Sequence, residues 1–305
     1  MAEPAEFRSY YGKPILKEPA WKQPDVPLYL FLGGVAGASA SMAALAGPTG
    51  YSRVGRVATL AAAATSVASV GALIHDLGRP ERFLYMLRVF KPTSPLSVGS
   101  WILAPFSGLA SAAALSRMTG RLPRLGALAG AGAGVLGPAM CTYTAVLLAD
   151  TATPAWHEGH RALPVLFAGS ALTGGVGVVL LAVPPAEVVP ARRLGVVGAA
   201  AELVASSRLE HGLGVVSETY RSGRAGTLLK ASKALTIAGA ALSVLGRRSR
   251  AVSALAGSAY LAAGLCTRFG VYSAGVVSTR DPKYVVVPQR ERRARVARAE
   301  AVERR

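Results

Sequence analysis

The chain has 305 residues, of which 51% are hydrophobic and 16% are charged, whereas about a quarter of the residues in a typical soluble domain are charged. Its formal net charge of +18 is high enough for a nucleic-acid-binding protein, but the basic residues cluster between long apolar runs, as in membrane-protein loops. The composition therefore excludes an ordinary soluble domain, and no nucleic-acid partner is expected.

Eight apolar runs are each close to the roughly 20 residues that a membrane-spanning helix needs. They cover residues 28–46, 57–76, 99–117, 125–149, 162–182, 194–213, 227–245 and 251–273. Short connections between the runs predict that neighbouring helices pack antiparallel. We therefore predict an all-α, polytopic protein of the cell (cytoplasmic) membrane. Its eight transmembrane helices form one bundle in the lipid bilayer, with both termini on the same face.

Polar segments flank this predicted membrane domain, residues 28–273. Residues 1–27 are rich in proline and charge, which predicts an N-terminal extramembrane segment, and residues 274–305 form a basic polar tail. The sixth apolar run is the weakest, since it contains Glu202, Arg208, Glu210 and His211. The two cysteines are isolated within apolar runs, so no metal or iron–sulfur site is expected in this chain.

Unusual polar residues gather at one face of the predicted bundle, which we call the N-face. Helices alternate in direction, so the even-numbered helices end where the first helix starts. The residues at this face are Asp25, Tyr29, His75, Asp76, Tyr143, Asp150, Glu210, His211 and Arg268. Ionisable groups at membrane depth are costly and usually mark a site or a pathway. The convergence predicts that the N-face is functional.

Tyr143 and Asp150 are seven residues apart, close to two helical turns, and therefore share one helix face about 10 Å apart. A phenol can donate a hydrogen bond to a carbonyl group, and a carboxylate can exchange protons with water. The alternative interpretation is that Tyr143 is an interfacial anchor, as tyrosines at membrane edges often are.

His75 and Asp76 end the second apolar run, directly before Gly78 and Pro80. A glycine just past a helix and a proline beyond it are stop signals, so the pair can simply belong to a helix cap. A histidine at the end of a lipid-embedded run also exchanges protons near neutral pH. Both interpretations stand at this stage.

Glu202 lies near the centre of the sixth run, where a carboxylate must be protonated, paired or beside water. Arg268, in the eighth run, is its candidate partner. The two residues are therefore predicted to form either a structural ion pair between helices or part of a proton path.

Four stretches resemble the NrfD/PsrC family, the membrane subunits of polysulfide-reductase-like molybdoenzyme complexes. They are "YYGKPILKEPAWKQPDVPLYLFLGGVAGASA", "HDLGRPERFLYML", "YTAVLLADTATPAWHEG" and "RFGVYSAGVVSTRDP". The stretches span nearly the whole chain, and the count of eight helices agrees with the family.

The resemblance implies a subunit that binds a quinone, such as menaquinone, near the N-face. A docked iron–sulfur, ferredoxin-like subunit would connect this quinone to a molybdopterin catalytic subunit. The anchor would carry no haem or metal of its own and would not be a complete enzyme alone. Tyr143 matches the tyrosine that hydrogen-bonds the quinone, and Tyr29 replaces a histidine of some members, with Asp25 one turn earlier. His75 and Asp76 match the second-helix motif and, with Asp150, are the candidates for proton transfer.

Two other functions compete with this one. In a haem b anchor, His75 and His211 would form an axial pair, since the remaining histidines, His157 and His160, look loop-borne. In a transporter or proton channel, Glu202, Arg268 and the glycine-rich fourth run, with Pro138 inside it, would line the path.

Overall fold

The computed structural model describes residues 15–246 and 248–303. Part of the predicted N-terminal segment, residues 1–14, and the last residues of the predicted tail, 304–305, lie outside this range. Among the described residues, the regular secondary structure consists of helices, without a strand. This confirms the prediction of an all-α polytopic membrane protein.

Seven helices of the described chain are long and apolar enough to cross a membrane. They are α1 (Asp25–Ala46), α2 (Ser52–Leu77), α4 (Pro95–Thr119), α5 (Pro123–Ala149), α7 (Leu163–Ala182), α10 (Gly223–Leu245) and α11 (Arg250–Arg280). The predicted sixth span is the helix α8 (Val189–His211), which has 23 residues but is not among these seven. Its arginines and glutamates lower its hydropathy, so the predicted count of eight spans is approximate.

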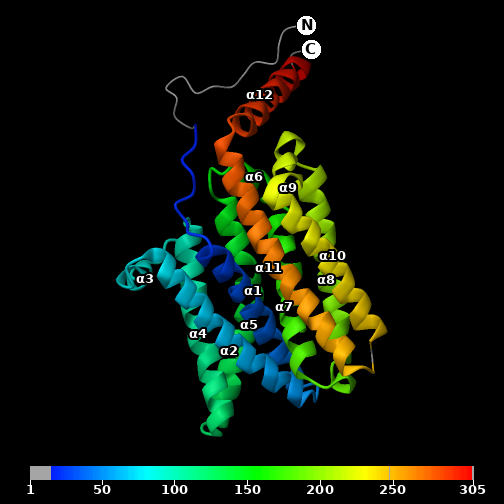
Figure 1. Ribbon diagram of the computed structural model, residues 1–305. Helices are drawn as coiled ribbons and strands as arrows, with labels where there is room; N and C mark the ends of the chain where they lie inside the picture. Colours follow the sequence, from blue (N-terminus) through cyan, green and yellow to red (C-terminus); the bar gives the residue numbers. More distant parts are fainter. Residues whose placement is uncertain (1–14, 247, 304–305) are drawn as a thin grey trace.

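The remaining helices are short, apart from the last one. They are α3 (Glu81–Met86), α6 (Pro154–Glu158), α9 (Glu218–Arg221), the 3-10 helices η1 (Pro185–Glu187) and η2 (Gly214–Ser217), and α12 (Lys283–Glu303). The helix α11 continues past the predicted end of the last span, and the predicted tail is mostly helical. Figure 1 shows that α12 extends beyond the ends of the other helices.

The long helices form two groups (Figure 1). The helices α1, α2, α4 and α5 pack together as the first helix group, and α7, α8, α10 and α11 pack together as the second. The helix α1 also packs against α7 and α11, which joins the groups. The N-face is the face where α1 begins and α2, α5, α8 and α11 end.

The end of α2 shows how the sequence sets a helix boundary. Gly78 adopts a left-handed conformation with φ 70°, and its N–H donates to the carbonyl oxygen of His75 at 3.3 Å. A residue with a side chain is strained at such a φ, so glycine suits this position. Pro80 then stands before α3. The predicted stop signals are therefore confirmed as the helix end.

A glycine contact brings α1 and α5 unusually close. A Cβ atom added at Gly37 would lie 2.5 Å from the carbonyl oxygen of Gly137, and a Cβ added at Gly137 would lie 2.5 Å from that of Gly37. No real side chain tolerates that distance, so both positions require glycine. Helix packing in lipid depends on small residues of this kind, because they let backbones touch.

Candidate functional site

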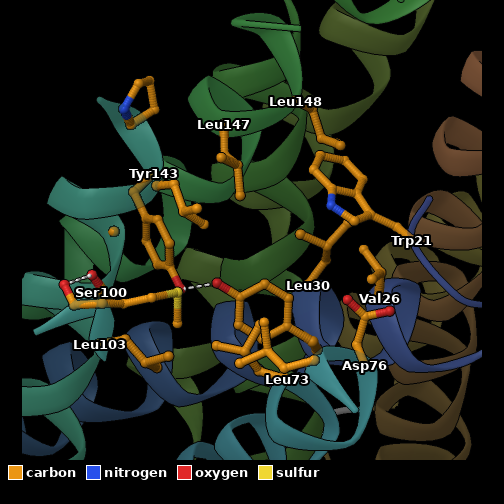
Figure 2. Close-up of a pocket in the computed structure, with 16 residues that line it drawn as sticks. Trp21, Val26, Leu30, Leu73, Asp76, Ser100, Leu103, Tyr143, Leu147 and Leu148 are labelled. Carbon is orange, nitrogen blue, oxygen red and sulfur yellow. Dashed lines mark hydrogen bonds between the residues drawn. The ribbon is translucent and has the colours of Figure 1, made fainter. Parts of the chain in front are cut away.

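A cavity of about 110 Å³ lies in the first helix group, near the N-face (Figure 2). Its wall is mostly apolar and includes Leu30 from α1, Leu73 from α2, Leu103 from α4 and Leu148 from α5. An engineered apolar cavity of roughly 150 Å³ binds benzene, so this volume is on the order of what one ring needs. The cavity therefore suits a flat, mostly apolar ring.

Two phenols meet at the wall of this cavity. The hydroxyl groups of Tyr29 from α1 and Tyr143 from α5 are hydrogen-bonded to each other, as the dashed line in Figure 2 shows. Both residues are buried, with exposed fractions of 5% and 8%. Each phenol carries one proton, and the bond between them uses one of the two. The other O–H group therefore remains able to donate to a ligand in the cavity.

The backbone of α4 holds the ring of Tyr143 in place. A Cβ atom added at Gly99 would lie 2.8 Å from two ring carbons of Tyr143. On the other side of the phenol pair, the hydroxyl group of Ser69 donates to the backbone carbonyl oxygen of Tyr29 at 3.0 Å. Contacts with α2 and α4 thus fix the position of both phenols.

The chain that precedes α1 covers part of the cavity. Trp21 lines the cavity and stacks on Trp156 of α6, with ring centroids 5.6 Å apart. The hydroxyl group of Tyr272 donates to the carbonyl oxygen of Trp21 at 2.5 Å. Asp76 also lines the cavity, and its Oδ1 accepts a hydrogen bond from the backbone N–H of Lys22 at 2.8 Å. These contacts tie the segment to three helices.

The structure brings only some of the predicted residues to the cavity. Tyr29, Asp76 and Tyr143 line it. Asp25 and His75 instead contact each other, with Oδ2 and Nδ1 2.7 Å apart, and the side chain of His75 is 77% exposed. Asp150 is exposed at the C-terminal end of α5 and is not part of the cavity wall.

Glu202 and Arg268 lie in the second helix group, and no ion pair joins them in the described part of the chain. Glu202 is 2% exposed. Its carboxylate accepts hydrogen bonds from Thr267 at 2.7 Å, from Thr173 and Thr236 at 3.4 Å and from Ser232 at 3.5 Å.

The guanidinium group of Arg268 has different partners. It donates to the backbone carbonyl oxygens of Leu30 at 3.3 Å and Phe167 at 3.0 Å. It also stands over the ring of Phe167, 3.7 Å from the centroid. One of the two predicted alternatives was a direct ion pair between Glu202 and Arg268. The described part of the chain does not contain this ion pair.

The two histidines of the predicted haem pair, His75 and His211, have separate partners. His75 contacts Asp25, whereas Nδ1 of His211 lies 3.0 Å from the carbonyl oxygen of Ser207 in its own helix. Among the described residues, no group of three or more His, Cys, Asp or Glu side chains is arranged to hold a metal ion.

Trp21 and Gly99 are two informative examples among the cavity residues that sequence reasoning missed. Trp21 belongs to the N-terminal motif that carries the family resemblance, so its position in the chain was a usable signal. Gly99 begins an apolar run like any other, and the sequence contains no signal for its contact with Tyr143.

Comparison with known proteins shows which family the segment around the cavity matches. No curated protein sequence matches the chain. A family model described as "Polysulphide reductase, NrfD" matches residues 18–187, which is more than half of the chain and includes every residue that lines the cavity. The chain therefore belongs to the NrfD family of polysulphide reductase membrane proteins.

Proposed function

We propose that this protein is the quinone-reactive membrane anchor of a multi-subunit oxidoreductase in the cell membrane. It exchanges electrons between the membrane quinone pool and a docked iron–sulfur subunit, which serves a molybdopterin enzyme. Membership of the NrfD family supports this role, because such subunits are associated with quinones and typically have these partners.

The phenol pair at the cavity wall is the observation that carries the proposal. A quinone ring is flat and apolar, and its two carbonyl oxygens accept hydrogen bonds. The free O–H group of the pair formed by Tyr29 and Tyr143 can donate to one of these oxygens, while the leucine-rich wall holds the ring. Hydrogen bonds of this kind fix the orientation of the ring in the cavity.

Asp76 has the right position to exchange protons with the bound ring. Oxidation of a quinol releases two protons together with two electrons, so the site needs a proton acceptor. Among the described residues that line the cavity, Asp76 is the one carboxylate. The neighbouring pair of His75 and Asp25 is exposed on the His75 side and provides exchange with water. Asp150, which is exposed outside the cavity, is retained as a proton-transfer candidate at the surface.

An apolar tail can leave the cavity toward the lipid beside α4. Leu96 lines the cavity and is also 49% exposed, so this wall reaches the outside of the bundle. Several large apolar side chains nearby in the sequence are exposed as well: Leu84, Tyr85, Val89, Phe90 and Trp101. Such an exposed apolar surface suits contact with acyl chains and with the isoprenoid tail of a quinone.

The substitution Tyr143→Phe tests the proposal, because it removes one O–H group and keeps the ring. We expect quinol-dependent turnover to fall by about 10- to 100-fold, the effect of losing a hydrogen bond worth roughly 1–3 kcal/mol. The matched control is Tyr51→Phe, which alters a half-buried phenol at the start of α2, on the opposite face and outside the cavity wall. Wild-type quinol turnover by a Tyr143→Phe variant that still carries its iron–sulfur subunit would contradict the proposal.

A further inference from the structure

A groove of about 930 Å³ lies at the N-face of the second helix group, away from the phenol cavity. It is bounded by α12, by the segment that follows α6 and by the end of α8. Its charged lining residues are Glu158, Arg161, Arg208, Glu291 and Arg292. The proposed quinone chemistry makes no use of these residues.

Ion pairs hold α12 along one side of this groove. Arg292 contacts Glu158 of α6 at 3.1 Å, and Lys283 contacts Glu218 of α9 at 2.9 Å. Hydrogen bonding to Glu218 raises the pKa of Lys283. The two pairs tether the start and the middle of α12 to the bundle, so the groove has a defined shape.

The pairs also leave the groove basic. Glu158 is engaged by Arg292, whereas Arg161 and Arg208 are exposed and take part in no ion pair within the described chain. Between residues 290 and 298 the sequence of α12 has five arginines and a single acid, Glu291. The charged lining of the groove therefore consists of three arginines and two glutamates, which favours an occupant with negative charge.

The direction of α12 favours a protein over a membrane surface. Figure 1 shows that α12 extends past the ends of the membrane helices. A helix that lies on a membrane needs a continuous apolar face. Between residues 289 and 298, Val296 is the one large apolar residue, so this part of α12 has no such face.

We propose that this groove docks an acidic segment of the electron-transfer subunit. The proposal rests on the proposed function, because it presumes a soluble redox partner at the N-face. Complementary charges at the edge of an interface raise the association rate and make binding dependent on salt. Arg161 and Arg208 provide that charge on the bundle side, and Arg292 of α12, which is paired with Glu158, lines the other side.

The test reverses two charges in the groove with Arg161→Glu and Arg208→Glu in one variant. The matched control is Arg121→Glu with Arg124→Glu, which makes the same change of charge at exposed positions on the opposite face. Binding of the iron–sulfur subunit to each detergent-purified variant is measured over a range of ionic strength. We expect binding by the groove variant to weaken about tenfold at low salt, with a smaller difference at high salt. The control should bind like the wild type.

The single variant Arg208→Glu repeats the test with one charge reversed, so that a folding defect of the double variant does not decide the result. Wild-type affinity and salt dependence in both groove variants would overturn the docking proposal alone, since Tyr143→Phe tests the quinone site separately. Unchanged subunit binding combined with lost binding to anionic phospholipid vesicles would identify a lipid site and also overturn it. A wild-type protein that binds no iron–sulfur subunit at any ionic strength would overturn both proposals.

Discussion

The two helix groups both bury polar side chains in an apolar interior, but they satisfy them differently. In the first group, Tyr29 and Tyr143 bond to each other beside a cavity, and one O–H group is left over. In the second group, hydroxyl groups from three helices surround the carboxylate of Glu202. A pair of polar groups that keeps an unused O–H donor beside a cavity indicates a site that binds a ligand. A carboxylate that is surrounded by hydroxyl donors indicates a structural role or a role in holding a proton.

Among the substitutions that distinguish the two helix groups, those at Glu202 are expected to have the largest effect, which is on stability. The variant Glu202→Ala removes the acceptor that the four hydroxyl groups share and leaves a void. We expect it to lower the free energy of unfolding by about 3 kcal/mol. Glu202→Gln retains an acceptor oxygen and similar volume, so it should cost about 1 kcal/mol. Thermal unfolding in detergent measures both.

The same pair of variants distinguishes a structural role from a proton path. A stable Glu202→Gln protein that no longer moves protons in vesicles would assign Glu202 to a path. Equal losses of stability in the Ala and Gln variants would contradict our view that the carboxylate satisfies the surrounding hydroxyl groups.

A smaller effect is expected from Gly99→Ala, which alters the cavity without removing a polar group. The new Cβ atom would lie 2.8 Å from the ring of Tyr143, so the ring must shift and its hydroxyl group must move with it. We expect the KM for quinol to rise about tenfold, because a misplaced hydrogen bond costs roughly 1–2 kcal/mol. Gly108→Ala is the control, since a Cβ at this position of the same helix meets no atom within 4 Å. An unchanged KM in Gly99→Ala would show that the ring of Tyr143 does not contact the quinol.

The smallest effect is expected from Asp76→Asn. Asparagine retains the oxygen that accepts the N–H of Lys22 but no longer binds a proton. We expect turnover to fall about fivefold, well below the roughly 100-fold loss of a buried general base, because water at the N-face offers another route. Glu81→Gln, on exposed α3, is the control, and turnover like the wild type's in Asp76→Asn would exclude Asp76 from proton transfer.

Most of the fold was predictable from the sequence because apolar runs of the right length have few alternatives in lipid. The eight predicted runs correspond to α1, α2, α4, α5, α7, α8, α10 and α11, and Gly78 with Pro80 predicted the end of α2. The presence of a long helix at α8 was also predictable. Because of its charged residues, however, α8 is not among the helices that are apolar enough to count as candidate membrane spans. The helical form of the tail was not predicted, since its composition suits a loose segment equally well.

The site was predictable only in part, since its geometry depends on contacts between distant segments. Tyr143 and Asp76 were predicted by their motifs. Trp21 reaches the cavity through its contacts with Trp156 and Tyr272, which lie far along the chain. Likewise, the hydroxyl groups around Glu202 come from residues that look like ordinary small polar residues in a span, so the sequence suggested Arg268 as its partner instead.

The contact between Gly37 and Gly137 has a consequence for ligand binding. It fixes the register of α1 against α5 about two helical turns, or roughly 12 Å, from the position of Tyr29. Two backbones in direct contact leave little freedom to slide, so the spacing between the phenols is set before any ligand arrives. A ring that enters the cavity therefore meets a preorganised receptor, and little of its binding energy is lost in ordering the protein.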